Sequence, residues 1–353
     1  MKRSLLLALL AVVALPTGAR ADDVPPTVTW YGDVRLDVIY LDSLMNDLRQ
    51  PLWVASEPGP DMRTNQLVAH PMLTRLGARI DPQPWGGPVD LGGAIELDLL
   101  GGNRPSPRLR DAYLTIGKGP IEILAGQTWD LASPLRPTAD AATFLWDAGN
   151  LGGWRTQLRA SYTRQTNRGT IHAAVAAGQA GDPVGTPTTT TLRPVAQARL
   201  ELERERVTAG IWGHAGTFTS RGAYAGGAYL RLDATARLHL RGEAYYGINL
   251  TDLRGGSANA VGNTDVHDRG GWAELAFDAH ELDTLTIGAS ADDPHDGDLT
   301  GGRSLQYTAY LIDQLRPWEH VVIGAELMQW TSNYLDSARG RAYRADVYAI
   351  VTF

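Results

Sequence analysis

The feature that most constrains this 353-residue chain is a one-by-one alternation of apolar and polar side chains, which recurs from residue 28 to the last residue. In segment 343–353, for example, Tyr343, Val347 and Phe353 share an apolar face. Arg344 and Asp346 lie on the other face. A period of two is typical of β-strands with one apolar and one polar face. Segments of this length also suit strands that cross a bilayer at a tilt. We therefore predict an all-β fold.

The alternating segments number about sixteen, an even count as bacterial barrels require, with fourteen or eighteen as the alternatives. After residue 15 no apolar run is long enough for a membrane helix, so a chain held in a membrane must cross it as a closed antiparallel β-barrel. Long connections alternate with short ones, as expected of outer loops and periplasmic turns. The predicted strands are 28–41, 71–81, 89–100, 108–117, 121–129, 155–163, 170–178, 195–203, 207–216, 223–232, 235–247, 269–277, 283–291, 304–313, 320–330 and 342–353.

Residues 1–21 are predicted to be a cleaved signal peptide, and residues 22–353 a single transmembrane barrel domain. Lys2 and Arg3 precede an apolar run of about a dozen residues, and Ala19 and Ala21 fit the pattern of signal-peptidase cleavage. An uncleaved membrane anchor is the alternative. The last strand, with Phe353 at its end, resembles the signal by which the assembly machinery of bacterial outer membranes recognises barrels. We therefore expect the chain in the outer membrane.

Composition excludes several classes of function. The chain has no Cys, which excludes a disulfide scaffold and Cys-based metal or redox motifs. Without residues 1–21 it holds 29 basic and 39 acidic residues, a net charge of −10, which argues against binding to nucleic acid. No nucleophile elbow, HExxH motif or phosphate loop is present, so we expect no enzyme and no cofactor. The acid-rich segment 292–298 lacks the spacing of a calcium loop, so we predict a solvated outer loop and no metal site.

The third long outer connection, residues 130–154, is unusually apolar. It contains Leu131, Leu135, Phe144, Leu145 and Trp146. An apolar loop of this length favours burial, and the barrel lumen is the available place, so we predict that it folds inward. A solvated surface loop is the alternative.

Three short sequences carry a resemblance to a known family. They are TRLG at 74–77, RLRDAY at 108–113 and AGQTW at 125–129, the last leading to Ser133-Pro134. Over roughly residues 31–162 the chain resembles the DcaP-like trimeric porins. The resemblance implies a sixteen-stranded barrel, a homotrimer, and the passage of small, often anionic, organic solutes. In such sixteen-stranded porins the third loop sets the narrowest point of the pore.

The expected lumen face is rich in arginine, and a wall of arginines in a narrow aqueous pore selects anions. Alternation leaves open whether Arg108 and Arg110 face the lumen. Lumenal acids such as Asp33, Glu96 and Glu243 oppose the arginines, so a balanced wall of ion pairs is the alternative. The candidate pore-lining and constriction residues are Arg35, Arg75, Arg79, Arg108, Arg110, Asp130, Arg136, Arg155 and Arg159.

Together these patterns predict an outer-membrane porin for the passive diffusion of small hydrophilic solutes, with a preference for anions. The expected surroundings are outer-membrane lipid and lipopolysaccharide. Three alternatives stay open: an occluded structural or adhesive barrel, a barrel enzyme, and a soluble periplasmic β-protein.

Overall fold

The computed structural model describes residues 27–57, 64–84, 87–102, 104–181, 194–218, 221–258 and 264–353. The predicted signal peptide lies outside the described residues. In these ranges no helix has the length and apolar character needed to cross a membrane.

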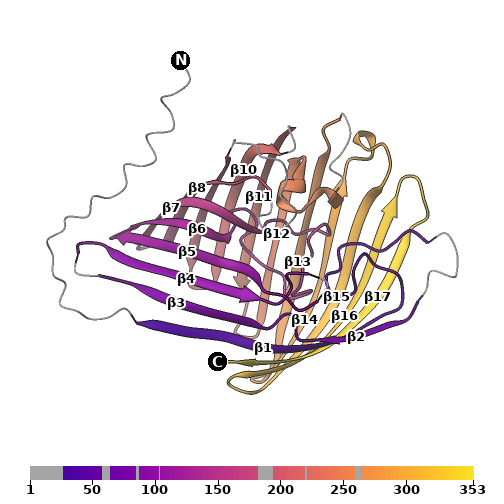
Figure 1. The fold of residues 1–353 in the computed structure, drawn as a ribbon, viewed down its shortest axis with the longest axis horizontal. Helices are drawn as coiled ribbons and strands as arrows, with labels where there is room; N and C mark the ends of the chain where they lie inside the picture. Colours follow the sequence, from indigo (N-terminus) through magenta and orange to yellow (C-terminus); the bar gives the residue numbers. More distant parts are fainter. Residues whose placement is uncertain are drawn as a thin grey trace.

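Strands dominate the structure, and they form one antiparallel sheet that closes on itself through the pairing of β1 with β17 (Figure 1). The strands are β1 (Val28–Leu41), β2 (Gln66–His70), β3 (Arg75–Pro84), β4 (Asp90–Asp98), β5 (Arg108–Lys118), β6 (Ile121–Trp129), β7 (Trp154–Thr166), β8 (Gly169–Gly178), β9 (Val195–Arg204), β10 (Val207–Phe218), β11 (Arg221–Asp233), β12 (Leu238–Ile248), β13 (His267–His280), β14 (Asp283–Pro294), β15 (Arg303–Trp318), β16 (Val321–Tyr334) and β17 (Gly340–Thr352). Short 3-10 turns lie in the outer loops: η2 (Leu250–Leu253), η3 (Gly256–Ala258) and η4 (Asp296–Asp298).

The seventeen segments make a sixteen-stranded barrel, because β2 and β3 are two parts of one strand. The first half of β1 pairs with β3, and its second half pairs with β2. The predicted second strand at 71–81 is therefore wrong at its start: the strand begins at 66 and is interrupted at 71–74. The other predicted strands are confirmed to within three residues at each end, except that β15 and β16 extend five and four residues beyond the predicted ends at 313 and 330.

The interruption has a local cause. Pro71 has no N–H to give to the ladder, and the chain turns there so that Met72 and Leu73 are buried against other apolar residues. The side chain of Thr74 replaces the missing ladder bond to β1: its Oγ1 accepts from the N–H of Arg35 at 3.1 Å. The alternation of apolar and polar residues therefore fails at 71–74, where consecutive side chains turn inward.

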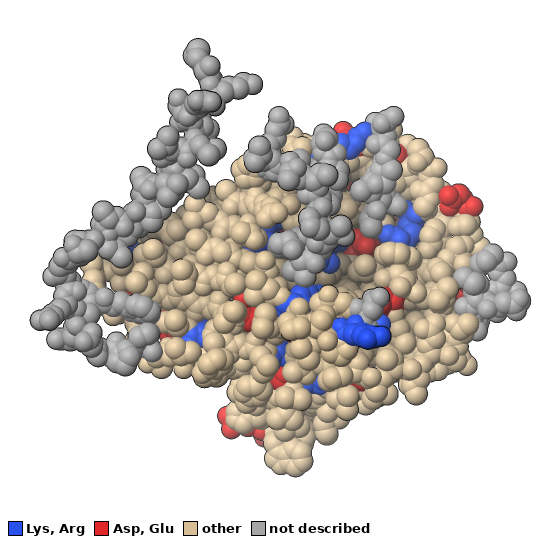
Figure 2. Space-filling model, in the orientation of Figure 1, with Lys and Arg blue, Asp and Glu red and all other residues tan. Residues whose placement is uncertain are grey.

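The outer surface of the barrel is apolar, as a bilayer requires. Along β1, residues Val34, Leu36 and Val38 are exposed, whereas Asp37 between them is fully buried on the lumen side. Figure 2 shows that most of the visible surface is uncharged, and that several Lys and Arg side chains appear in the hollow near its centre. The chain is thus a transmembrane barrel with its charges turned inward.

Loops fill much of the lumen and supply the buried core. We name the outer connections L1 (42–65), L3 (130–153) and L6 (249–266). Leu145 and Ala148 of L3 pack against Trp330 of the wall and against L1. Leu151 of L3 packs against Leu253 of L6. The prediction that the third loop folds inward is confirmed, and the solvated alternative is wrong.

Candidate functional site

L3 follows the inside of the barrel wall and is held there by three glutamates. Loop N–H groups need acceptors when they are buried, and glutamates on β12, β13 and β16 provide them. The hydrogen bonds run from Leu135 N to Glu243 Oε1 (2.8 Å), from Thr138 N to Glu274 Oε2 (2.9 Å) and from Asp140 N to Glu326 Oε2 (3.0 Å).

These contacts remove three acids from the pore. Glu243, Glu274 and Glu326 are each at most 5% exposed. Glu243 also accepts a bond from the Ser133 hydroxyl. L3 lies so close to this wall that a Cβ at Gly149, whose φ is +117°, would stand 2.4 Å from the Gly271 carbonyl oxygen. The three glutamates therefore hold L3 and are not available to attract cations.

The root of L3 is fixed by a buried charge network. Arg155 Nε lies 2.6 Å from Asp130 Oδ1, and Arg155 Nη1 lies 3.4 Å from Asp252 Oδ1 in η2. Burial alone would raise the pKa of Asp252, but its contacts with His214 and Arg155 lower that pKa to about 2. Asp130 and Arg155 thus join L3 to L6, and both are almost completely buried.

Arg108 and Arg110 face the lumen because β5 contains a bulge. The register with β4 shifts between the pairs Glu96↔Asp111 and Leu97↔Leu109. Both arginines are nonetheless buried in ion pairs: Arg108 Nη2 lies 2.5 Å from Asp98 Oδ2, and Arg110 Nε lies 2.5 Å from Glu96 Oε1. Their charges are largely compensated, so neither can bind a solute without losing its acidic partner.

Arg35 and Arg79 are also paired, each with an acid two residues further along its own strand. Arg35 Nη2 lies 2.6 Å from Asp37 Oδ1. Arg79 Nε lies 2.7 Å from Asp81 Oδ1, and about half of each of these two side chains is exposed. For six of the nine candidates, the balanced wall of ion pairs is therefore the better description.

Arg75, Arg136 and Arg159 are different, because they are partly exposed and make no ion pair with any residue that the structure describes. Arg159 donates instead to Gln157 Oε1 at 3.1 Å and to the Trp129 carbonyl. Burial, followed by the positive charges of Arg110 and Arg75, lowers the pKa of Arg136 to about 10. The guanidinium of Arg136 stays charged at neutral pH and lies near Arg75.

Arg199 on β9 joins this set, although it was not among the predicted pore residues. It is partly exposed, and it too forms no ion pair within the described ranges. Arg199 is separated from Arg159 by β8, whose lumenal residues there are the small Ala174 and Ala176. Alternation had placed Arg199 on the polar face of its strand, but only the fold shows that it stands beside Arg159.

Acids near these four arginines reduce the local positive charge. Asp33 lies close to Arg75, and Asp111 lies close to Arg136. Neither acid forms an ion pair with these arginines. The cationic set, which we call the open arginines, thus consists of Arg75, Arg136, Arg159 and Arg199.

The prediction of a solvated loop at 292–298 is wrong at its start, because residues 292–294 end β14 and Asp292 is fully buried. Asp298 Oδ2 lies 2.8 Å from His267 Nδ1 and accepts from the backbone N–H of His267 at 3.0 Å. Among the described residues no group of three or more His, Cys, Asp or Glu side chains could hold a metal ion.

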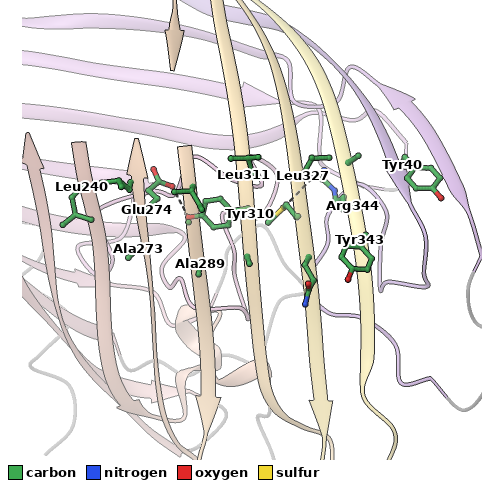
Figure 3. Close-up of a pocket in the computed structure, with 17 residues that line it drawn as sticks. Tyr40, Leu240, Ala273, Glu274, Ala289, Tyr310, Leu311, Leu327, Tyr343 and Arg344 are labelled. Carbon is green, nitrogen blue, oxygen red and sulfur yellow. Dashed lines mark hydrogen bonds between the residues drawn. The ribbon is translucent and has the colours of Figure 1, made fainter. Parts of the chain in front are cut away.

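A hollow in the wall of β12–β17 lies on the outer side and is unsuited to polar solutes (Figure 3). Its exposed lining is apolar and includes Leu311, Leu327 and Tyr343. Glu274 and Arg344 belong to the same strands but are buried on the lumen side. An apolar hollow on the outer face does not suit a hydrophilic solute, so the solute path is to be sought in the lumen.

Comparison with known proteins identifies the fold. No family model matches the chain, and the search of curated proteins found no match. The chain is similar to the outer membrane channel DcaP of Acinetobacter baumannii, with 18% identity and a TM-score of 0.75 over 95% of this chain and 100% of that chain. The chain has the fold of a bacterial outer-membrane porin.

Two further outer-membrane proteins of known structure are similar to the chain. One is an anion-selective porin from Comamonas acidovorans, with 12% identity and a TM-score of 0.63 over 93% of this chain and 100% of that one. The other is the trimer form of OmpT, an outer membrane protein of Vibrio cholerae, with 12% identity and a TM-score of 0.57 over 93% of this chain and 99% of that one. The fold expected from the DcaP-like resemblance is confirmed and extends over nearly the whole chain. In this porin fold, L3 borders the lumen beside the open arginines.

Proposed function

We propose that residues 22–353 form a passive outer-membrane porin for small hydrophilic organic solutes, with a preference for anions. The protein couples no energy source and performs no catalysis. The porin fold supports the channel, and the open arginines support the charge preference. The similar porin from Comamonas acidovorans is anion-selective, which agrees with this proposal.

The observation that carries the proposal is an asymmetry between the two sides of the lumen. On β12, β13 and β16 the glutamates are buried under L3, where they accept its backbone N–H groups. On β3, L3, β7 and β9 the open arginines keep their charges without an acidic partner. Cations without an ion-pair partner, in a narrow aqueous passage with low-dielectric walls, attract anions and repel cations even though Asp33 and Asp111 lie nearby.

The test is the ratio of anion to cation permeability, taken from the reversal potential of the refolded protein in planar bilayers under a salt gradient. Arg75→Gln and Arg136→Gln should each lower the ratio roughly twofold, since each removes one uncompensated charge from the passage. Arg79→Gln is the matched control: it lies on the same strand as Arg75 but is paired with Asp81. An unchanged ratio in both test variants contradicts the anion preference.

We also propose a homotrimer in contact with outer-membrane lipid and lipopolysaccharide. The trimer form of OmpT, which shares the fold, supports the trimer. Light scattering of the detergent complex, corrected for bound detergent, should give three times the mass of one chain. A monomeric mass from a conducting protein contradicts this part of the proposal.

An occluded barrel is the second candidate function, because L1, L3 and L6 together fill much of the lumen. It predicts a folded, membrane-inserted barrel without current. Deletion of L1 residues 46–53 would then open the pore, whereas in a porin it changes only the conductance.

A further inference from the structure

Four aromatic rings form a buried cluster where L3 leaves and rejoins the wall. Trp129 ends β6, Trp154 begins β7, and Phe144 and Trp146 come from the middle of L3. The ring of Trp154 lies edge-on to Trp129 at 5.2 Å between centroids and to Trp146 at 5.9 Å. Phe144 lies edge-on to Trp129 at 5.6 Å. Edge-to-face pairs at these distances are attractive, so the cluster ties both ends of L3 to its middle.

The backbone of L3 makes a sharp turn at the residues that contribute to this cluster. Phe144 and Leu145 both adopt left-handed conformations, with φ of 55° and 60°. Such conformations are unfavourable for bulky residues and persist only when the surroundings enforce them. Both side chains are buried, Phe144 in the ring cluster and Leu145 in the core with Trp330. Packing therefore holds a strained turn in place.

Arginines lie over the faces of these rings. The guanidinium of Arg136 is 4.2 Å from the centroid of Trp129 and 5.4 Å from that of Phe144. Arg110 and Arg108 lie 4.4 Å and 5.0 Å from Trp154. These distances are in the range of cation–π attraction.

The kind of partner that holds Arg136 decides whether its positive charge is cancelled. An acidic partner, such as those of Arg155, fixes a guanidinium but cancels its charge. A ring attracts the cation through its quadrupole and adds no net charge. The guanidinium of Arg136 is held by ring faces, and it forms no ion pair and no hydrogen bond with the described residues. It is therefore fixed in position while its charge remains available.

We propose that Trp129 and Phe144 are positioning residues for the charge filter: they fix Arg136 beside the pore without neutralising it. The anion preference then depends on two residues that carry no charge and do not contact the solute, since both rings are buried. This inference rests on the proposed anion preference and adds to it the means by which the charge is kept in place.

The experiment is a double-mutant cycle on the permeability ratio. Trp129→Leu removes the ring face and should lower the anion-to-cation ratio roughly twofold, because Arg136 becomes mobile or pairs with a nearby acid. Trp129→Phe keeps a face and should retain most of the ratio. In an Arg136→Gln background, Trp129→Leu should cause no further change.

Trp330→Leu is the matched control. Trp330 is a fully buried tryptophan of the wall, and no arginine in the described part of the chain lies over its ring. Its replacement loosens the packing of Leu145 in L3 but removes no ring from Arg136, so the ratio should fall clearly less than in Trp129→Leu. Folding of every variant is checked by the shift in gel mobility on heating. If Trp129→Leu does not fold, Phe144→Leu takes its place, because it removes the second ring over Arg136.

The outcomes separate the two proposals. An unchanged ratio in Arg136→Gln itself contradicts the proposed anion preference. A lowered ratio in Arg136→Gln together with an unchanged ratio in Trp129→Leu overturns only the positioning role. A further fall in the double variant also overturns it, since the ring would then act by a route other than Arg136.

Discussion

Arg155 lies at the root of L3 and Arg136 lies within it, yet the first is held by acids and the second by rings. Arg155, at the root of the loop, is buried between Asp130 and Asp252. Arg136, further along the loop, lies on Trp129 and Phe144 and is partly exposed. The guanidinium of Arg155 fixes two loops together. The guanidinium of Arg136 presents its charge to the lumen. The partner, and not the residue type, decides which role an arginine takes.

The largest effect is expected when the arginine that is held by acids is removed. Arg155→Met leaves Asp130 and Asp252 buried without a positive partner, and breaking a buried pair in this way costs about 3–5 kcal/mol. The free energy of unfolding, measured by guanidinium titration in detergent micelles, should fall by that amount. Chymotrypsin should also cleave L3 faster. A loss below about 1 kcal/mol would contradict the anchoring role of Arg155.

Acid should loosen the same anchor. The folded-state pKa of Asp252 is lowered from 3.8 to about 2, so its contribution is present above about pH 4 and is lost as the pH falls toward 2. The shift corresponds to about 2 kcal/mol. Pepsin, which is active in this range, should begin to cleave L6 near Leu250 and Leu253 over this interval.

Asp252→Asn is the control for the acid experiment. It removes the titrating group, so cleavage of L6 should be fast already at pH 4 and should show no added step toward pH 2. A wild-type protein whose L6 is cleaved at the same rate throughout would show that Asp252 does not hold the loop.

The smallest effect is expected at an exposed pair. Arg79→Gln removes a charge whose partner, Asp81, is about half exposed, and such pairs contribute about 0–1 kcal/mol. Unfolding free energy and permeability ratio should both stay near the wild-type values. A fall in the ratio equal to that of Arg75→Gln would contradict the distinction between paired and open arginines.

Sequence alone predicted most of the barrel, because a strand that separates lipid from water must alternate with period two. It missed the break at 71–74, where Pro71 leaves the ladder and Thr74 completes it with a side-chain bond. It also left the face of Arg108 and Arg110 open, since the bulge in β5 shifts the register by one residue. Periodicity carries no information on such local insertions.

The candidate site was predictable only in part. Seven of the nine residues proposed from the sequence lie on the lumen face of strands, and Asp130 and Arg136 lie in L3. Six of the nine are in ion pairs. The partners are set by the fold: Asp252 lies 97 positions from Arg155 along the chain and reaches it only through L6. Arg199 was missed for the same reason, because its neighbour Arg159 lies across β8. Charge compensation is a property of the three-dimensional arrangement.

The most direct test of the central claim is the current of the wild-type protein in a planar bilayer under a salt gradient. We expect stepwise currents, in groups of three for a trimer, and a reversal potential with the sign of an anion-selective pore. A reversal potential of the cation sign would contradict the role of the open arginines. A folded, inserted barrel without current would contradict the porin itself.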